Sequence, residues 1–113
     1  MERRMKGKIH GVTLGEDQGE HRQENVKTLL SGQQIFGKRE EDNPFDSSAI
    51  KLYADEACTL PLGYVPREIA KIIVEQSKFG WTYAYEVTEV TGGSPGKPSR
   101  GCNIDVIARK VDS

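Results

Sequence analysis

Hydrophobic and polar residues alternate with a period of two in several stretches of the chain, and this pattern predicts β-strands. The strictest alternation is in WTYAYEVTEV, residues 81–90, where aromatic residues and valine at odd positions face away from smaller and polar residues at even positions. Because aromatic and β-branched side chains favour strands, this is the best-defined extended segment. Further extended segments are expected, in chain order, at residues 6–14, 33–39, 49–54, 60–65 and 103–110.

Apolar residues at helical spacing predict two helices between these strands. In ENVKTLLS, residues 24–31, the valine and the leucines fall on one helical face, and Gly32 can adopt the left-handed conformation that ends a helix. Pro66 stands at the first position of the second helix, where proline is tolerated because its missing N–H would have no partner in any case. The broad apolar face of this helix continues until Phe79-Gly80.

These elements predict a mainly β fold with two inserted helices. The segment GGSPGKPSRG, residues 92–101, has four glycines and two prolines in ten positions, and we expect a mobile loop without regular structure there. Six short strands interrupted by two helices are typical of a small, six-stranded antiparallel barrel similar to the oligonucleotide-binding (OB) fold.

Length and charge limit the classes of protein to which the chain can belong. With 113 residues, we expect a single domain over residues 1–113 with its core at about 6–110. Sixteen basic and seventeen acidic residues give a net charge of -1, so any contact with nucleic acid must be local. The basic start MERRMKGK is followed by no apolar segment, and the longest apolar run, residues 72–74, is far too short for a membrane span. We expect a soluble, cytoplasmic protein.

The residue types that bind metals or perform catalysis are present but poorly arranged. Cys58 and Cys102 have no second cysteine at zinc-ligand spacing, so we expect two reduced thiols, with a single disulfide as the alternative. His10 and His21 also lack a recognisable ligand spacing, and solvated side chains explain them better than a metal site. Since no P-loop and no Ser-His-Asp or Cys-His arrangement exists, we expect no cofactor and no catalytic activity.

The stretch DNPFDSSAIKLY, residues 42–53, combines a turn with residues that suit a binding site. Asn43-Pro44 favours a turn, because the proline ring restricts the preceding residue and the Asn side chain can mimic a backbone turn. Phe45 and Asp46 follow immediately, although a turn needs neither. Two interpretations stay open at this point: a core Phe beside a capping Asp, or a ring for stacking beside an acceptor for a hydroxyl.

The pattern RxxxNPFDxxAIKLY, followed by LGYVPREIA, resembles the HIRAN domain. This module is found alone in bacteria and fused to fork-remodelling DNA translocases in eukaryotes. The resemblance runs from about Gly11 to Lys110, and it rests on the pairing of the two motifs at this separation. It implies a stand-alone HIRAN domain of the bacterial type: a modified OB barrel that, in the fused eukaryotic examples, captures the 3′-hydroxyl end of single-stranded DNA.

The resemblance also implies roles for six residues. Phe45 matches the ring that stacks on the terminal base, and Asp46 matches the carboxylate that accepts a hydrogen bond from the 3′-hydroxyl. Gln23 or its neighbour stands where the eukaryotic DNA binders have a second stacking aromatic, so one wall of the base pocket is missing. Arg22, Arg67 and Tyr64 match phosphate contacts, and Asn43 matches the residue that fixes the loop. From spacing alone, the two arginines would be solvated surface charges and Tyr64 would be a half-buried strand residue.

We therefore expect a non-catalytic module that binds the 3′-hydroxyl end of single-stranded DNA in repair or replication-related processes, with a helicase or nuclease as a possible protein partner. The alternative is a protein-interaction or scaffold domain that recruits a nuclease, helicase or phage component without direct DNA contact. The net charge of -1 and the missing second aromatic at Gln23 favour this alternative. A small hydrolase or zinc enzyme is the weakest interpretation, because neither a nucleophile with its base nor a metal-ligand set is present. Oligomeric state and the choice between DNA and RNA stay open.

Overall fold

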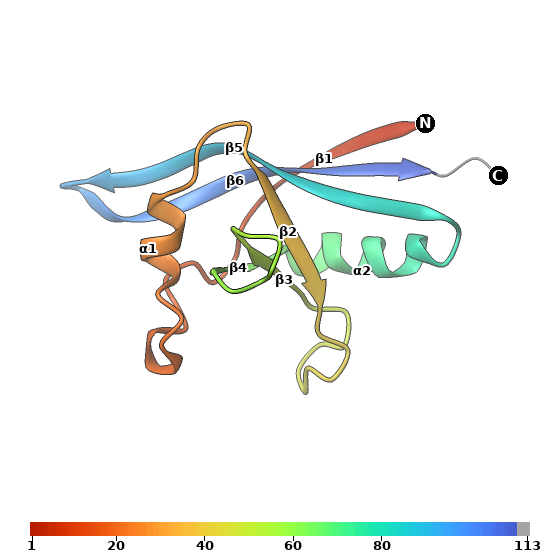
Figure 1. Ribbon diagram of the computed structural model, residues 1–113, viewed down its shortest axis with the longest axis horizontal. Coiled ribbons are helices and arrows are strands. Elements are labelled where there is room, and N and C mark those ends of the chain that lie inside the picture. Colours follow the sequence, from red (N-terminus) through yellow and green to blue (C-terminus); the bar gives the residue numbers. More distant parts are fainter. Residues whose placement is uncertain (111–113) are drawn as a thin grey trace.

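Six antiparallel strands form one continuous sheet that curves into a half-barrel (Figure 1). The computed structural model describes residues 1–110, and within this range the strands follow the order β1-β6-β5-β2-β3-β4. The elements along the chain are β1 (Glu2–Lys8), the short 3-10 helix η1 (Glu16–Gln18), α1 (Arg22–Lys27), β2 (Gln34–Arg39), β3 (Ile50–Tyr53), β4 (Pro61–Tyr64), α2 (Arg67–Ser77), β5 (Trp81–Ser94) and β6 (Lys97–Lys110).

A backbone bridge joins the two edges of the sheet. After β1 the chain turns toward β4, where His10 and Tyr64 exchange two N–H to carbonyl hydrogen bonds, each 2.8 Å long. Gly63 lies beside this bridge with φ +146°, and a Cβ atom there would collide with the carbonyl oxygen of His10. The close approach of the two backbones explains the glycine in LGYV. The predicted OB-like antiparallel architecture is confirmed.

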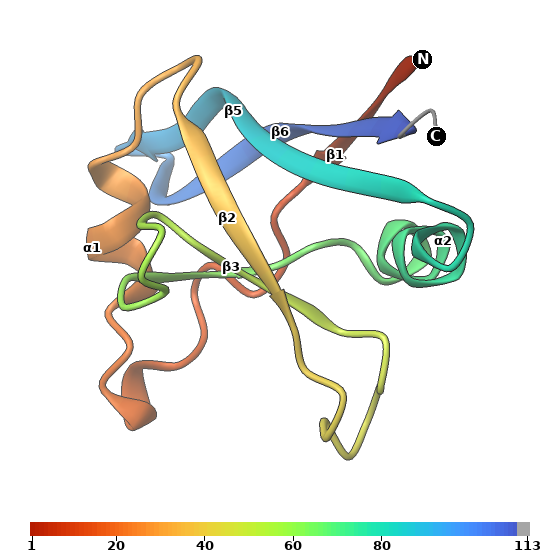
Figure 2. The same ribbon diagram turned by 45° about the vertical axis from the view of Figure 1, so that its right-hand side comes forward.

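The concave side of the sheet and the helices enclose the hydrophobic core. The alternation predicted for residues 81–90 is confirmed, since Tyr85 and Val87 are buried while Thr82 and Thr88 are exposed. Helix α2, seen nearly end-on in Figure 2, packs under β5 and buries Ala70 and Ile73. Pro66 is the N-cap of α2 rather than its first residue. Within residues 1–110, neither helix has the length and apolar character of a membrane-spanning segment.

The first predicted strand and the first predicted helix have the wrong boundaries. β1 occupies Glu2–Lys8 rather than 6–14, because its pairing with β6 starts at the very beginning of the chain. α1 occupies Arg22–Lys27 rather than 24–31. Its apolar pattern continues beyond its end, since Leu29 is buried after the last helical residue.

The glycine-rich segment forms paired strands, which contradicts the prediction of a loop without regular structure at 92–101. It forms the end of the long β5–β6 hairpin, which turns through Pro95-Gly96 and pairs Ser94 with Lys97. Gly92 and Gly93 have φ values of +78° and +80° at a shift in the strand register, and glycine accommodates such a bulge without strain. The glycines therefore serve strand pairing here. The hairpin projects away from the rest of the fold (Figure 1).

The two cysteines occur as separate free thiols. Cys102 is completely buried in the core, where burial raises the pKa of its thiol to about 11. Cys58 lies in the turn between β3 and β4 and is partly exposed. The expectation of unpaired thiols is therefore met, and the disulfide alternative is not.

Candidate nucleic-acid interface

The loop between β2 and β3, residues 40–49, is a turn held by its own polar side chains. Asn43 Oδ1 accepts hydrogen bonds from the backbone N–H groups of Phe45 (2.9 Å) and Asp46 (3.1 Å). Asp46 Oδ1 accepts a further bond from the N–H of Ser48 at 2.9 Å. Each side chain thus mimics a backbone turn, as Asn and Asp commonly do. The predicted turn before the strand at 50–53 is confirmed.

This turn places the ring of Phe45 in solvent and the carboxylate of Asp46 near the start of α2. Phe45 is 90% exposed, which excludes the interpretation as a core Phe. Burying a Phe side chain is worth about 1.5 to 3 kcal/mol, so a ring left in water contributes none of this to the stability of the fold. The Asp46 side chain is 20% exposed, and its Oδ2 lies 3.5 Å from Arg67 Nε at the start of α2.

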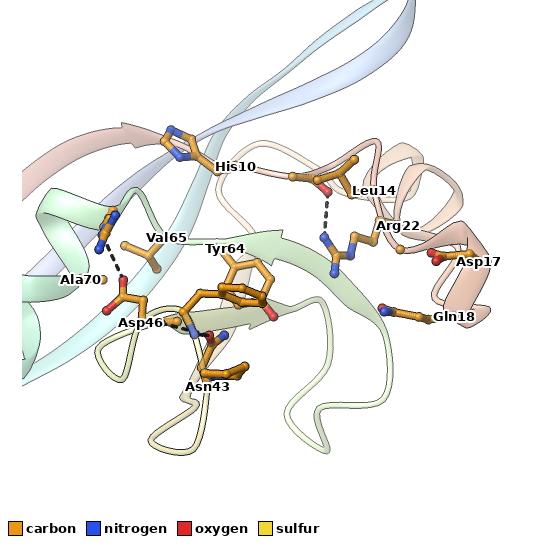
Figure 3. A pocket seen from close by; sticks show the side chains of 16 residues that line it. His10, Leu14, Asp17, Gln18, Arg22, Asn43, Asp46, Tyr64, Val65 and Ala70 are labelled. Atoms are coloured by element: carbon orange, nitrogen blue, oxygen red, sulfur yellow. Dashed lines mark hydrogen bonds and ion pairs between the residues drawn. The ribbon is translucent and has the colours of Figure 1, made fainter.

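A single open pocket of about 740 Å³ lies next to these residues (Figure 3). In this view Asp46 and Ala70 lie at one end, Asp17 and Gln18 lie at the other, and Tyr64 lies between them. The lining is mostly apolar, with a few polar groups that converge on it, as is usual for a ligand site. All six candidate residues line this pocket: Arg22, Asn43, Phe45, Asp46, Tyr64 and Arg67.

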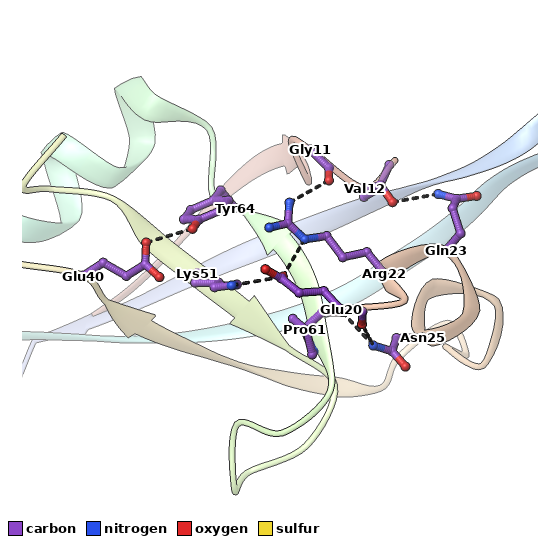
Figure 4. Close-up of polar contacts among 10 residues, drawn as sticks. All are labelled: Gly11, Val12, Glu20, Arg22, Gln23, Asn25, Glu40, Lys51, Pro61 and Tyr64. Atoms are coloured by element: carbon purple, nitrogen blue, oxygen red, sulfur yellow. Dashed lines mark hydrogen bonds and ion pairs between the residues drawn. The ribbon is translucent and has the colours of Figure 1, made fainter. Parts of the chain in front are cut away.

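Arg22 occupies the inner part of the pocket as a buried cation. Only 5% of it is exposed; Nε donates to Glu20 Oε1 at 2.8 Å, and Nη1 donates to the carbonyl oxygen of Gly11 at 2.9 Å (Figure 4). Lys51 Nζ lies 3.0 Å from the same Glu20 oxygen. Burial alone would raise the pKa of the Glu20 carboxyl, but the hydrogen bonds from Arg22 and Lys51 outweigh it and lower this pKa. Arg22 is therefore not a solvated surface charge.

Tyr64 and Glu40 connect the floor of the pocket to the Phe45 loop. The Tyr64 hydroxyl donates to Glu40 Oε1 at 2.8 Å, and Asn43 Nδ2 donates to the same oxygen at 3.1 Å. The guanidinium carbon of Arg22 lies 5.5 Å from the centroid of the Tyr64 ring. Burial, together with the neighbouring Glu40, raises the pKa of Tyr64 to about 12, so the hydroxyl keeps its proton near neutral pH. The position of the loop thus depends on Glu40.

Gln23 has a structural role where the resemblance implies a second aromatic. Its Nε2 donates to the carbonyl oxygens of Val12 (3.0 Å) and Arg100 (2.8 Å), and its Oε1 accepts from the N–H of Arg100 at 2.8 Å. These bonds join α1 to β6. Gln23 is not among the residues that line the pocket, whereas Leu14, which is 64% exposed, is.

The sequence matches the model of the HIRAN domain over residues 6–104. The chain belongs to the HIRAN domain family. Domains of this family are known as DNA-binding modules, not as catalytic domains. The resemblance inferred from the paired motifs is therefore confirmed.

Two crystal structures share the fold of this HIRAN domain. One is the HIRAN domain of human HLTF, with a TM-score of 0.61, 13% sequence identity, and coverage of 93% of this chain and 74% of that chain. The other is a protein from Lactobacillus plantarum, with a TM-score of 0.64, 17% identity, and coverage of 96% of this chain and 100% of that chain. At these identities the likeness shows the fold alone. A search of the curated proteins gives no match.

The roles of Glu40 beside the pocket and of Leu14 in its lining were not predicted from the sequence. Glu40 lies in the charged run KREED, which has no pattern that separates a part-buried acceptor from solvated neighbours. Leu14 was counted with the first strand, but it lies in the loop after it. In addition, no group of three or more His, Cys, Asp or Glu side chains among residues 1–110 is arranged to hold a metal ion.

Proposed function

We propose that this HIRAN domain binds the 3′-hydroxyl end of single-stranded DNA in the pocket of Phe45 and Asp46. One observation carries the proposal: a ring that is 90% exposed and a carboxylate on the next residue border the same pocket of about 740 Å³. A flat ring next to an acceptor suits a terminal nucleotide, which presents a base for stacking and a hydroxyl as donor.

Phe45 supplies the stacking surface. A base on an aromatic ring is worth about 1 to 3 kcal/mol, and the contact tolerates every base, so the site would not read sequence. The loop is already fixed by Asn43 and Glu40, and little conformational entropy would be lost when the base binds. Leu14 adds apolar surface to the pocket, and no aromatic residue stands at Gln23.

Asp46 supplies the specificity for the hydroxyl end. A hydrogen bond from the terminal hydroxyl to the carboxylate is worth roughly 1.5 to 3 kcal/mol, about ten- to a hundredfold in affinity. A 3′-phosphate, or a strand that continues past the pocket, would bring negative charge to the same place and be repelled. Arg67 Nε lies 3.5 Å from the Asp46 carboxylate, so the site also offers a cation beside this acceptor.

Arg67 and Arg22 would contact phosphates in different ways. Arg67 is 64% exposed at the start of α2, where free backbone N–H groups also favour an anion. Arg22 has partners within residues 1–110 for Nε and Nη1 only, which leaves Nη2 for a ligand in the pocket. The Tyr64 hydroxyl is held by Glu40, so we assign its ring, rather than its hydroxyl, to the floor of the site.

The test is a fluorescence anisotropy titration of one short oligonucleotide, labelled at its 5′ end, with either a 3′-hydroxyl or a 3′-phosphate. We expect tighter binding of the hydroxyl end, and Asp46→Asn should remove the difference. Phe45→Ala should weaken binding of both ends about five- to a hundredfold. Phe79→Ala is the matched control, because Phe79 is 63% exposed and lies outside this pocket.

Equal affinity of the wild-type domain for the two ends would exclude the proposed role of Asp46. Equal affinities of the Phe45 and Phe79 variants would exclude stacking. The alternative function, recruitment of a protein, predicts a protein partner that stays bound after nuclease treatment. It also predicts no change in anisotropy when the domain is added to any oligonucleotide.

A further inference from the structure

We propose that the DNA strand leaves the terminal pocket along helix α2, over a basic stripe formed by Arg67, Lys71 and Lys78. This inference rests on the proposed function and adds the path of the nucleotides on the 5′ side of the bound end. It assigns a second binding surface to a region in which the resemblance implies no role for any residue beyond Arg67.

The spacing of the stripe places its residues on one face of α2. Arg67, Lys71, Val74 and Lys78 stand at i, i+4, i+7 and i+11, and at 100° per residue they fall within an arc of about 60°. With a rise of about 1.5 Å per residue, the stripe is about 16 Å long. Stacked nucleotides rise about 3.4 Å each along a strand, so this length would accommodate about five of them.

A second groove of about 580 Å³ lies along this face. The residues that line it on the side of α2 are Lys71, Ile72, Val74, Glu75, Gln76 and Lys78, and Arg39 and Ser48 complete the lining. The loop between β2 and β3 contributes to both cavities, because Asp46 lines the first and Ser48, two residues later, lines the second. On this proposal, a strand anchored at Asp46 passes over this loop into the second groove.

Charge distinguishes this exit from the other end of the pocket. The opposite end is bordered by η1, which carries Glu16 and Asp17, and Asp17 lines the pocket itself. A phosphate backbone leaving there would meet two carboxylates. On the α2 side the groove is lined by one carboxylate, Glu75, and by three basic residues, Arg39, Lys71 and Lys78. Lys71 has no ion pair within residues 1–110, and the exposed pairing of Lys78 with Glu75 at 3.3 Å is weak.

The guanidinium of Arg39 is fixed on the far side of the groove. Its Nε donates to the carbonyl oxygen of Ser47 at 2.9 Å, and its Nη1 lies 3.6 Å from Glu41 Oε1. Arg39 thus cannot extend freely toward a strand. The remaining cations of the groove are Lys71 in α2 and Lys78 at its C-cap, and they are the residues to test.

The experiment compares a 3′-hydroxyl dinucleotide with an oligonucleotide of about ten nucleotides. The wild-type domain should bind the longer strand more tightly, and the double variant Lys71→Ala/Lys78→Ala should lose this gain while it binds the dinucleotide normally. Each phosphate contact contributes about 0.7 to the salt slope of single strands, so the slope for the longer strand should become shallower by about 1.4. Equivalently, the ratio of wild-type to variant affinity should fall about sevenfold between 50 and 200 mM salt.

The matched control is Lys27→Ala/Lys97→Ala, which removes the same charge from the end of α1 and from the hairpin tip. An equal loss in this variant, or an unchanged affinity of the α2 variant for the longer strand, would overturn the stripe. If the stripe is overturned in this way, the proposed function still stands, provided that the domain binds the dinucleotide normally and prefers a 3′-hydroxyl to a 3′-phosphate. A wild-type domain that binds neither oligonucleotide would overturn the proposed function itself. If polyglutamate of similar length binds as tightly as the longer oligonucleotide and depends on the same two lysines, the stripe is a general polyanion surface, and its assignment to the DNA strand is overturned.

Discussion

Replacement of the buried Arg22 by methionine tests whether the ionic cluster beneath the pocket holds the fold together. Methionine keeps an unbranched side chain of similar length but removes the charge and all five donors. Glu20 would lose its 2.8 Å partner, and the Gly11 carbonyl would lose its 2.9 Å donor. The carboxylate would then rely on Lys51 alone, at 3.0 Å.

The expected loss is large because the charges are shielded from water. Removing one partner of a buried ion pair typically destabilises a protein by about 3 to 5 kcal/mol. Since Lys51 still compensates Glu20, we expect the lower end, about 3 kcal/mol, against a total of about 5 to 15 kcal/mol for a domain. For a chain of this size the melting temperature should fall by about 10 to 15 °C.

Urea unfolding followed by the fluorescence of Trp81, the only tryptophan, measures this loss. The control is Arg109→Met, because Arg109 pairs with Glu2 at a similar distance, 3.0 Å, but on an exposed surface. This control should leave the unfolding midpoint nearly unchanged. A loss below about 1 kcal/mol for the Arg22 variant, or equal midpoints for the two variants, would refute the reasoning that burial makes this cluster strong.

The remaining predictions concern acid stability, thiol reactivity and backbone packing. Because the cluster lowers the pKa of Glu20 below its ordinary 4.5, its stabilisation is present above that pH and is lost as the pH falls further, so Glu20→Gln should flatten the acid side of a stability-pH curve. A thiol reagent at pH 8 should modify Cys58 in the native protein, whereas Cys102, which is buried and has a pKa of about 11, should react only after unfolding. Mass spectrometry can follow the two modifications, and modification of both thiols in the native protein would contradict the burial of Cys102. Gly63→Ala should destabilise the fold by about 1 to 3 kcal/mol or more in urea unfolding, since its Cβ would strike the His10 carbonyl; an unchanged midpoint would show that the bridge can relax.

The sequence predicted elements well where a single element carries its own pattern. The alternation at 81–90 and the apolar face after Pro66 correspond to β5 and α2, because in both segments one face is buried against the core and the other is exposed. β1 has no such pattern: ERRMKGK is mostly charged, and its strand conformation comes from pairing with β6, almost one hundred residues later. Pairing over such a distance leaves no local signal in the first eight residues.

The chemistry of the pocket was predictable in part for the same reason. Phe45 and Asp46 stand together in a recognisable turn, so their neighbourhood could be inferred. The burial of Arg22 could not, because Lys51, which shares Glu20 with it, lies 29 residues away in the chain. Likewise, the glycines at 92–93 have the composition of a loop but the conformation of a bulge within paired strands.

The position of the two strand ends has a practical consequence. Glu2 pairs with Arg109, so β1 begins where β6 finishes, and both views show this edge on the side away from the Phe45 loop. A surface tether placed near Glu2 or Lys110 would therefore lie away from the mouth of the terminal pocket. A dinucleotide that binds in this pocket should bind equally well to the domain tethered at either position.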